Sequence, residues 1–422
     1  MCRRACIALS FLLLVQCFLI TVAGAAAGIE LTHYTYGSHG EKWHEYLDVM
    51  AKRFEASTGI AVDFIISSNA TADYHSKFLT MVAGGTAPDI LDASPGLAGP
   101  LIGRDIFEDL TPYVKRDNFP LERIPPVAVE GVTTPDRKLW GIPCSVYPVV
   151  TFFNTDLFAE TGLLNPRELG EQWTWETLIS SAKRLTRDKD GDGVNETYGT
   201  SRISYRWEMQ VHQAGGQLYD RVAYPTKSQF NSPAVLRAVE FIAGLYTDGI
   251  ATNNHTTYNV FRGTAGFAVV DGPGTVSSYQ NVPFRWDIAW QPKGPASRAA
   301  RVNPDGFQIV AVSHQKDAAW QWVRFLTSAD NQLELARITG RMPSLREAMV
   351  RYPKIGGIEL PSNWEALIDT AFDPTGYAAY IVPNATQIDA VVNPIMNRIW
   401  NGQLAPAVGL QQIHEVLPGL LQ

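Results

Sequence analysis

The sequence contains only four cysteines among 422 residues. Cys2, Cys6 and Cys17 lie in an N-terminal segment that we expect to be removed, which leaves Cys144 alone. A single thiol can form neither an intramolecular disulfide nor a thiolate zinc site. No recognisable histidine motif accompanies Cys144, so a cysteine nucleophile has little support. The mature protein is therefore expected to be stabilised by its hydrophobic core alone.

An excess of basic charge is also missing. Lys and Arg total 35 against 42 Asp and Glu, giving a formal net charge of -7. Nucleic acids require clustered positive charge, so they are not expected as partners. Apolar residues make up 45% and charged residues 18% of the chain, which excludes disorder and a coiled coil. At about 150 residues per domain, the length predicts two or three domains.

Residues 1–28 have the pattern of a secretory signal peptide. Arg3 and Arg4 precede an almost uncharged apolar stretch at 7–22, and small residues follow at 23–28. We expect cleavage within 23–28 and a periplasmic or other extracytoplasmic location. The alternative is an uncleaved membrane anchor, because the apolar run approaches spanning length. No later stretch is long and apolar enough to span a bilayer.

The mature chain begins with a predicted β-α-β unit. Residues 29–36 alternate apolar and polar side chains, and residues 61–66 form a β-branched run, so both are predicted strands. A helix between them is predicted by apolar residues at helical spacing, namely Trp43, Leu47, Met50 and Phe54. Gly59 is expected to end that helix. Such a unit implies parallel strands with a right-handed crossover.

Strands and helices continue to alternate along the rest of the chain. Further helices are predicted at 74–83, 175–185, 235–246 and 319–326. Further strands are predicted at 89–92, 149–153, 266–270 and 307–312. The alternation predicts an α/β fold, and the length favours two doubly wound lobes over one large sheet.

A set of short motifs resembles the extracellular solute-binding proteins of ATP-driven (ABC) importers, in the group that includes maltose-binding and glycerol-3-phosphate-binding proteins. The resemblance covers nearly the whole mature chain and depends on the order and spacing of the motifs. They are TMVAGGTAPDI (80–90), VVTFFNTDLF (149–158), WTWETLISSAKRL (173–185), GGQLY (215–219), FRGTAGFAVV (261–270), IAWQPKGP (288–295), AAWQWVRFL (318–326) and TGRMPS (339–344).

The resemblance implies two doubly wound lobes joined by crossing hinge segments, the type II arrangement of periplasmic binding proteins, with the ligand between the lobes. It places the hinges near 142–148, 301–305 and 339–343. The N-terminal lobe would comprise 29–142 plus 306–340, and the C-terminal lobe 148–300 plus 343–422. Pro143 and Pro148 bracket the first hinge, and proline stiffens an extended connector.

Ligands of open α/β sheets bind beyond the carboxyl ends of the strands. The loops and connectors at those positions supply the candidate ligand-binding residues Tyr36, Ser38, His39, Asp92, Ser94, Ser145, Tyr147, Asp271, Gly272, Gly274, Gly306 and Phe307. Each has an alternative role. Asp92 could cap a helix, the tyrosines could pack in the core or the hinge, and the glycines could serve only the turn.

The resemblance adds Trp207, Arg341, Tyr380 and Asn384 as candidates. Related proteins often carry a tryptophan after the Gly-Pro turn, where this chain has Gly274, so an aromatic wall would have to come from Trp207, Tyr147, Tyr279 or Phe307. Arg341 could pair with a ligand carboxylate or phosphate, or form a structural ion pair. Core packing is the alternative for Trp207.

The loop that contains Asp188, Asp190, Asp192 and Glu196 resembles a calcium loop. Carboxylates at alternate positions can converge on a cation, and Gly193 allows the turn. The twelfth position is Gly199, where an EF-hand has a bidentate glutamate, so Glu196 would have to substitute. The alternative is a solvated loop of Asx turns. Beyond this structural calcium, no cofactor is predicted.

The leading functional prediction is a monomeric, non-enzymatic binding protein without catalytic residues. It would capture a sugar, a polyol or a glycerol phosphodiester between its lobes and deliver it to the membrane permease of an ABC importer. The competing prediction is a secreted glycoside hydrolase that uses a pair among Asp89, Asp92 and Asp271. The sequence has no nucleophile elbow, metal-binding histidine pair or phosphate-binding P-loop.

Overall fold

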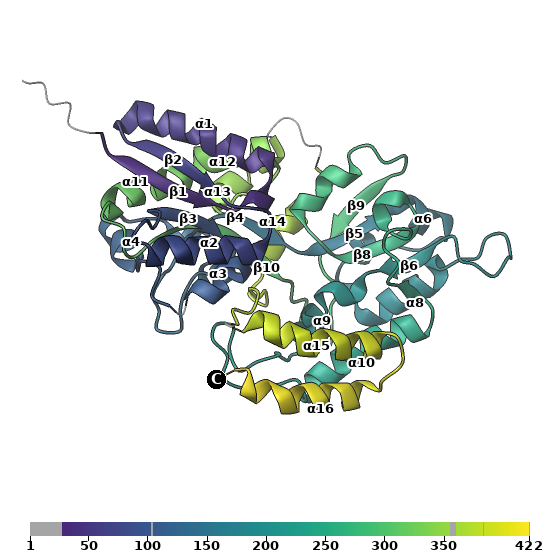
Figure 1. Ribbon diagram of the computed structural model, residues 1–422. Coiled ribbons are helices and arrows are strands. Elements are labelled where there is room, and N and C mark those ends of the chain that lie inside the picture. The colour runs from purple at the N-terminus through teal and green to yellow at the C-terminus, as the bar shows by residue number, and fades with distance from the viewer. Residues whose placement is uncertain (1–27, 103, 355–359, 383, 422) are drawn as a thin grey trace, which may run out of the picture.

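The computed structural model describes residues 28–102, 104–354, 360–382 and 384–421. The predicted signal peptide, except for Gly28, lies outside these residues and stays a prediction. None of the helices in the described ranges is long and apolar enough to cross a membrane. The described chain forms two α/β lobes that lie side by side, each built on its own sheet (Figure 1).

The first lobe contains a five-stranded sheet. Its strands, in spatial order, are β2 (Ala61–Ile66), β1 (Glu30–Thr35), β3 (Ile90–Ala93), β10 (Val302–Ile309) and β4 (Ile142–Pro148). β1 pairs in parallel with β2 and β3, which confirms the predicted β-α-β unit. The intervening helix α1 (Glu41–Thr58) buries its predicted apolar face, and Gly59 ends it in the left-handed conformation at φ 75°.

The second lobe contains the other five-stranded sheet. Its strands, in spatial order, are β7 (Ala251–Thr252), β6 (Tyr198–Ser201), β8 (Ala265–Asp271), β5 (Val150–Asn154) and β9 (Trp286–Ala289). β6 is parallel to β7 and β8, whereas β5 is antiparallel to β8 and β9.

Both sheets have one antiparallel strand in the same place, fourth in the spatial order. In the first lobe it is β10, whose chain arrives from the second lobe. In the second lobe it is β5, which follows β4 of the first lobe after the single residue Val149. The predicted α/β class is therefore confirmed, and its sheets are mixed because each lobe incorporates a strand that crosses over from the other.

Helices cover both faces of each sheet. Those of the first lobe are α1, α2 (Thr71–Ala83), α3 (Pro95–Ile102), α4 (Thr111–Asp117), α5 (Pro126–Glu130), α11 (Lys316–Leu326), α12 (Ala329–Thr339) and α13 (Arg346–Met349). Figure 1 shows α1 on one side of the sheet and α2 with α3 on the other.

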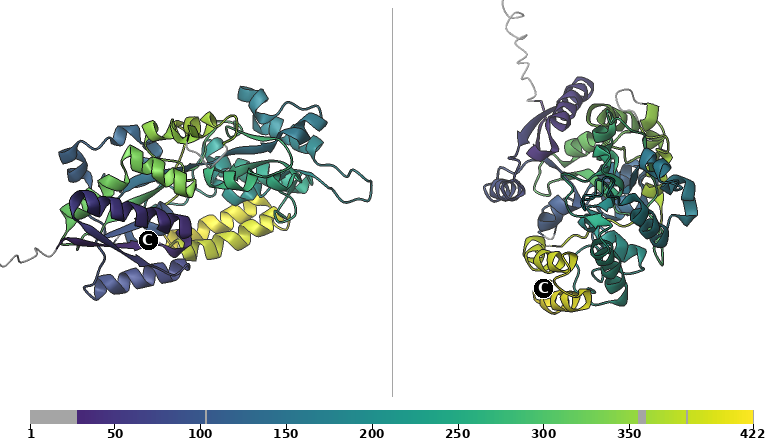
Figure 2. Two further views of the ribbon diagram at one scale, coloured as in Figure 1. Left: turned by 90° about the horizontal axis from the view of Figure 1, so that it is seen from above. Right: turned by 90° about the vertical axis from the view of Figure 1, so that its right-hand side faces the viewer.

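The remaining helices belong to the second lobe or to its junction with the first. They are α6 (Thr155–Glu160), α7 (Pro166–Leu169), α8 (Trp175–Leu185), α9 (Glu208–Gln213), α10 (Pro233–Thr247), α14 (Glu365–Phe372), α15 (Ala385–Trp400) and α16 (Pro406–Val416). The pair α15 and α16 lies side by side along one edge of this lobe (Figure 2).

The three segments predicted as hinges lie next to one another. β4 and β10 pair antiparallel, with Tyr147 opposite Asn303. The segment after α12 joins them, because Pro343 bridges to Ser145. The prediction of a strand at 307–312 was wrong at both ends, since β10 begins at Val302 and ends at Ile309. Residues 302–305 belong to the predicted second hinge, yet they pair with β4. Pro304 stands opposite Val146, whose N–H donates to Met342 and not to β10, so no ladder hydrogen bond is lost at the proline.

Candidate functional site

Two hollows open where the two lobes meet. The first, the hinge hollow, has a volume of about 360 Å³. It is lined by His39, Lys42, Trp43, Ser145, Val146, Tyr147, Pro273, Gly274, Asp305, Thr339, Arg341 and Met342. The second, the aromatic hollow, has a volume of about 320 Å³. It is lined by Gly96 of α3 and, mainly from the second lobe, by Trp207, Glu208, Leu218, Tyr219, Phe230, Arg301, Ala379, Tyr380, Val382, Ala385, Ile388, Asp389, Val392 and Asn393.

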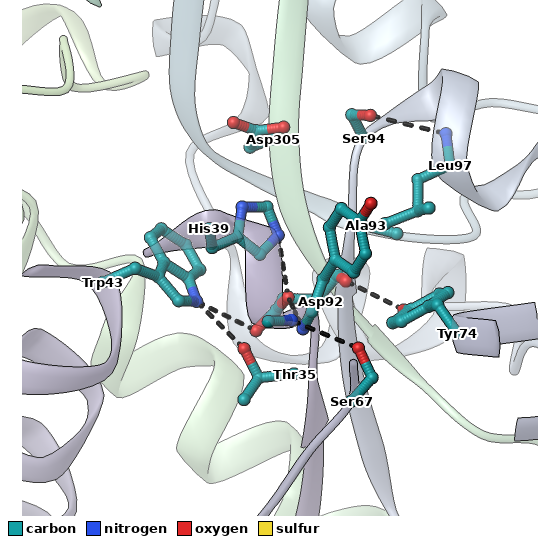
Figure 3. A network of polar contacts seen from close by, with 12 residues as sticks. Thr35, His39, Trp43, Ser67, Tyr74, Asp92, Ala93, Ser94, Leu97 and Asp305 are labelled. Carbon is teal, nitrogen blue, oxygen red and sulfur yellow. Dashed lines mark hydrogen bonds and ion pairs between the residues drawn. The ribbon is translucent and has the colours of Figure 1, made fainter. Parts of the chain in front are cut away.

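A buried carboxylate organises the first-lobe side of the hinge hollow (Figure 3). Asp92, at the end of β3, is 1% exposed. The indole Nε1 of Trp43 donates to it at 3.1 Å, and Nε2 of His39 lies 3.0 Å from its other oxygen. Nε2 of His33 approaches within 3.3 Å. The Asp92 carboxylate therefore has several partners inside the protein, and its predicted role in ligand binding stays a prediction.

The neighbours of the two histidines determine which ring nitrogen carries the proton. Trp322 donates its Nε1 proton to Nδ1 of His33, and Arg341 contacts Nδ1 of His39 at 3.1 Å. Indole and guanidinium groups are donors only, so both Nδ1 atoms accept and each proton is carried on the Nε2 atom that lies near Asp92. Burial raises the pKa of Asp92, but His39 and His33 outweigh it and hold that pKa well below its ordinary value. Asp92 is therefore ionised.

The guanidinium of Arg341 is paired with a carboxylate inside the hinge hollow. Its guanidinium pairs with Asp305 on β10 and contacts His39, and it lies 4.6 Å from the ring centre of Trp43. Of the two roles predicted for Arg341, the structure contains the structural ion pair. A contact between Arg341 and an anionic ligand stays a prediction.

Tyr147 supplies the aromatic wall beside the Gly-Pro turn. Its hydroxyl accepts a hydrogen bond from the backbone N–H of Gly272 at 3.0 Å. A Cβ atom at Gly272 would lie 2.5 Å from the Tyr147 ring and 2.7 Å from the carbonyl oxygen of Pro148, so only glycine fits. A Cβ atom at Gly274 would also meet the ring, at 3.3 Å. The tyrosine therefore packs where a side chain at 274 would begin.

The aromatic hollow combines ring faces with a charge pair. Trp207, at the start of α9, is half-buried and packs edge-on against Phe230 and Trp400. The neighbouring Glu208 pairs with Arg301 at 3.1 Å. The hollow thus presents an indole beside a compensated carboxylate, which is a suitable combination for a polar ligand with an apolar face.

Tyr380 is held in place by two hydrogen bonds. Its hydroxyl accepts from the N–H of Leu218 at 3.0 Å and lies 3.0 Å from Nε2 of His212. The His212 ring stacks on Tyr377 with 3.8 Å between ring centres. Burial lowers the pKa of His212 to about 4, so the imidazole is neutral near pH 7 and accepts the Tyr380 proton.

None of the three aspartates of the hydrolase prediction lines the hinge hollow or the aromatic hollow. Asp89 accepts hydrogen bonds from Thr32 and Ser313 at the opposite end of β3 from Asp92. Asp271 lies in the second sheet, at the end of β8, where burial raises its pKa. A glycosidase needs two carboxyl groups across one bond, whereas Asp89 and Asp92 are each held by partners inside the first lobe.

The structure brings seven of the predicted ligand residues to the two hollows. His39, Ser145, Tyr147, Gly274 and Arg341 line the hinge hollow, whereas Trp207 and Tyr380 line the aromatic hollow. Asp92 contacts His39 and Trp43 of the hinge hollow, and Gly272 contacts Tyr147. Asp271 precedes Gly272 at the end of β8. Their contacts with a ligand stay predictions.

Six other predicted residues have structural partners outside the hollows. Tyr36 and Ser38 donate to the carbonyl of Asn69, Ser94 accepts from the N–H of Leu97 at the start of α3, and Asn384 donates to Leu420. Gly306 and Phe307 lie within β10, where they pair with Ala93 and Asp92. Their ligand-binding roles stay predictions.

Sequence reasoning missed several lining residues. Lys42, Asp305, Glu208 and Arg301 carry charge into the hollows, and Gly96 brings the first lobe against the aromatic hollow. A signal was present for two of them, because Arg301 and Asp305 lie in the predicted second hinge. Glu208 directly follows Trp207, but its partner Arg301 is distant in sequence.

The predicted calcium loop projects from the end of the second lobe (Figure 1). Oxygen atoms of Asp188, Asp190, Asp192 and Glu196 all lie within 4.8 Å of one another, and all four residues are exposed. The same carboxylates accept hydrogen bonds from backbone N–H groups of the loop, as Asp188 does from Gly191. Both predicted forms of the loop agree with this geometry, so calcium binding stays a prediction.

Comparison with known proteins identifies related sequences. A model of the family described as bacterial extracellular solute-binding protein matches residues 49–351. The galactooligosaccharide-binding protein of Bacillus subtilis (strain 168) is 22% identical over 274 residues. That match covers 62% of this chain and 61% of the relative, so the chain spans about three fifths of the length of that curated protein.

Solved structures share the fold. The sugar-binding protein MalE from Xanthomonas citri superposes with a TM-score of 0.78 at 20% identity, covering 93% of this chain and 97% of that one. The cyclic alpha-maltosyl-1,6-maltose binding protein from Arthrobacter globiformis has a TM-score of 0.77 at 18% identity, covering 93% and 99%. At these identities the likeness establishes the two-lobed architecture.

Proposed function

The chain belongs to the family of bacterial extracellular solute-binding proteins, and from this premise we propose that it captures a sugar or sugar-like solute between its lobes and releases it unchanged to the permease of an ABC importer. Similar proteins are named for galactooligosaccharides, maltose and other saccharides. The proposal transfers that class of ligand to this chain. It treats the protein as a binding protein without catalysis.

The aromatic hollow carries the proposal. An indole face at Trp207 suits the apolar face of a pyranose ring, and the Glu208–Arg301 pair offers acceptors and donors for hydroxyl groups. The Tyr380 ring lines the same hollow and is fixed by its two hydrogen bonds. Gly96 comes from the first lobe, so a ligand in this hollow would contact both lobes.

Contacts with both lobes matter because a ligand shifts a conformational equilibrium only by its difference in affinity for the two states. A solute bound by Trp207 and by the first turn of α3 at Gly96 would favour the state in which these groups approach each other. The three adjacent connectors, β4, β10 and the segment after α12, are the segments about which the lobes would move.

Membership of the family supports a location and a partner for the protein. An extracellular binding protein is exported, and we propose that residues 1–28 act as the cleaved signal peptide and that the mature protein is a periplasmic monomer. Its macromolecular partner would be the permease of the importer. Polyols and glycerol phosphodiesters remain candidate ligands beside sugars.

A panel of mono- and oligosaccharides, polyols and glycerol phosphodiesters tests the proposal. Thermal unfolding of the purified mature chain should shift upward with at least one saccharide, because a ligand that binds only the folded state stabilises it. Chromatography of the same mixture should return the saccharide intact. Release of a shorter sugar would establish an enzyme, and an unshifted transition with every saccharide would contradict sugar binding.

A further inference from the structure

The aromatic hollow is the first of three connected hollows on the second lobe. A second hollow of about 730 Å³ shares Trp207, Glu208 and Asn393 with it. A third, of about 490 Å³, shares Asn253, Trp400 and Asn401 with the second. The shared lining residues show that the three hollows adjoin one another in a row, and we call this row the groove.

Helix α15 forms one wall of this groove along most of its length. Residues from its first half, such as Asp389, line the aromatic hollow, Asn397 lines the second hollow, and Asn401 just past its end lines the third. A helix rises 1.5 Å per residue, so the wall from Asp389 to Asn401 is roughly 20 Å long. Figure 1 shows α15 running from beneath the crossing strands outward along the second lobe.

The α15 wall presents a row of amides. Asn393, Asn397 and Asn401 are spaced four residues apart, which places them on one face of the helix. All three are exposed, and no hydrogen-bond partner is found for their side chains in the part of the chain that the structure describes. Asparagine is a weak helix former, so Asn393 and Asn397 do not serve the helix itself.

Polar groups of the facing loops continue this chemistry. Asn253 lines the second and third hollows, and Ser204 and His255 line the second. The Oδ1 atom of Asn253 accepts a hydrogen bond from the Tyr246 hydroxyl, so the amide nitrogen of Asn253 is left to donate to a ligand. Each amide offers both an acceptor and donors, as hydroxyl groups require, and Trp207 stands at the junction with the aromatic hollow.

We propose that the ligand is a linear oligosaccharide rather than a monosaccharide, and that its chain leaves the space between the lobes past Trp207 and follows the amide row of α15. This inference rests on the proposed function and specifies its ligand. One end of the chain binds between the lobes, whereas the remaining units contact only the second lobe.

Isothermal titration calorimetry tests the proposal with linear gluco-, galacto- and manno-oligosaccharides, each from the monosaccharide to the pentasaccharide. The affinity of the unmodified protein should increase with chain length in at least one series. The double variant N393A/N397A should bind the pentasaccharide of that series about tenfold more weakly, as expected for two lost hydrogen bonds, and the shortest ligand unchanged.

The variant Q387A is the matched control, because Gln387 is exposed on the same helix and is not among the residues that line the groove. It should bind every length as the unmodified protein does. Equal affinity for monosaccharide and pentasaccharide would overturn the extended groove and leave sugar binding intact. An equal loss at all lengths in N393A/N397A would also overturn it. Failure of every saccharide to bind would overturn the proposed function together with this inference.

Discussion

The hinge hollow and the groove along α15 use polar side chains in opposite ways. In the hinge hollow the polar groups are paired with one another, as in the chain from Asp92 through His39 and Arg341 to Asp305. Along α15 the amides of Asn393 and Asn397 are exposed and have no partner among the described residues. The first arrangement stabilises the protein, whereas the second leaves hydrogen-bonding capacity for a ligand.

The contrast teaches that a polar residue near a cleft is not by that fact a ligand residue. Asp92 lies at the end of a strand, where the position of ligands in α/β sheets predicts binding residues, yet it is buried and surrounded by donors. Substitutions in the hinge hollow should therefore change stability most, and substitutions in the groove should change affinity most.

The largest expected effect is the replacement of Asp92. D92A would leave Nε2 of His33 and of His39 beside a buried gap and Nε1 of Trp43 with only the Thr35 hydroxyl as acceptor, so the free energy of unfolding should fall by about 3–5 kcal/mol. Urea denaturation would measure the change. The control D63A removes an exposed aspartate from β2 and should stay within about 0.5 kcal/mol. A loss below 1 kcal/mol in D92A would mean that the buried network contributes no more to stability than an exposed ion pair does.

The pH dependence of stability sharpens the same point on the second lobe. The pKa of His212 falls from 6.5 to about 4 on folding, so the unfolded chain binds a proton that the folded chain does not hold between these values. Stability should therefore decrease as the pH falls through this window, by about 3 kcal/mol in total. The Asp92 contribution is lost only below its ordinary value of 3.8, so the two are separable.

The variant H212Q retains an acceptor for Tyr380 without titrating. Urea denaturation at several pH values from 7 to 4.5 should therefore show a flatter profile for H212Q than for the unmodified protein. Parallel profiles for the two proteins would rule out His212 as the source of the acid sensitivity.

Arg341 should give an intermediate effect. R341M leaves Asp305 without its cation and His39 without its donor, so unfolding should become easier by about 1–2 kcal/mol. The control R351M breaks an ion pair with the exposed Asp330 and should cost less than about 0.5 kcal/mol. If both variants lose the same stability, the hinge pair contributes no more than an ordinary surface pair.

The acidic loop should give the smallest effect. Its four exposed carboxylates already converge, so calcium at about fivefold above its Kd should stabilise the folded chain by about 1 kcal/mol. Titration calorimetry should show a heat of calcium binding for the unmodified protein. This heat should be absent for D188N, and it should also be absent when the unmodified protein is titrated in the presence of a chelator. The absence of any heat would leave the loop as a set of Asx turns.

Local patterns explain which parts of the fold were predictable. The β1-α1-β2 unit and its end at Gly59 depend on residues close in sequence, so spacing alone predicted them. The start of β10 depends on pairing with β4, more than 150 residues earlier. The spacing of residues in a short stretch of sequence cannot indicate a pairing of that range, because the partner strand lies far outside the stretch.

The site was predictable to the same extent. The rule that ligands bind beyond the carboxyl ends of strands predicted His39 and Tyr147, and both line the hinge hollow. The partners that occupy Asp92 could not be inferred, because Trp322 fixes His33 from the far end of the chain. The amide row of α15 was missed as well, since three asparagines at helical spacing are meaningful only once a groove lies beside them.

The central claim is that a saccharide binds between the lobes against Trp207. The most direct test is calorimetric titration of the unmodified protein and of W207A with the tightest-binding saccharide of the panel. Loss of the ring should weaken binding about tenfold to a hundredfold, equivalent to about 1.5–3 kcal/mol for a large buried side chain, while urea denaturation shows a folded variant. Undiminished affinity in folded W207A would contradict the claim.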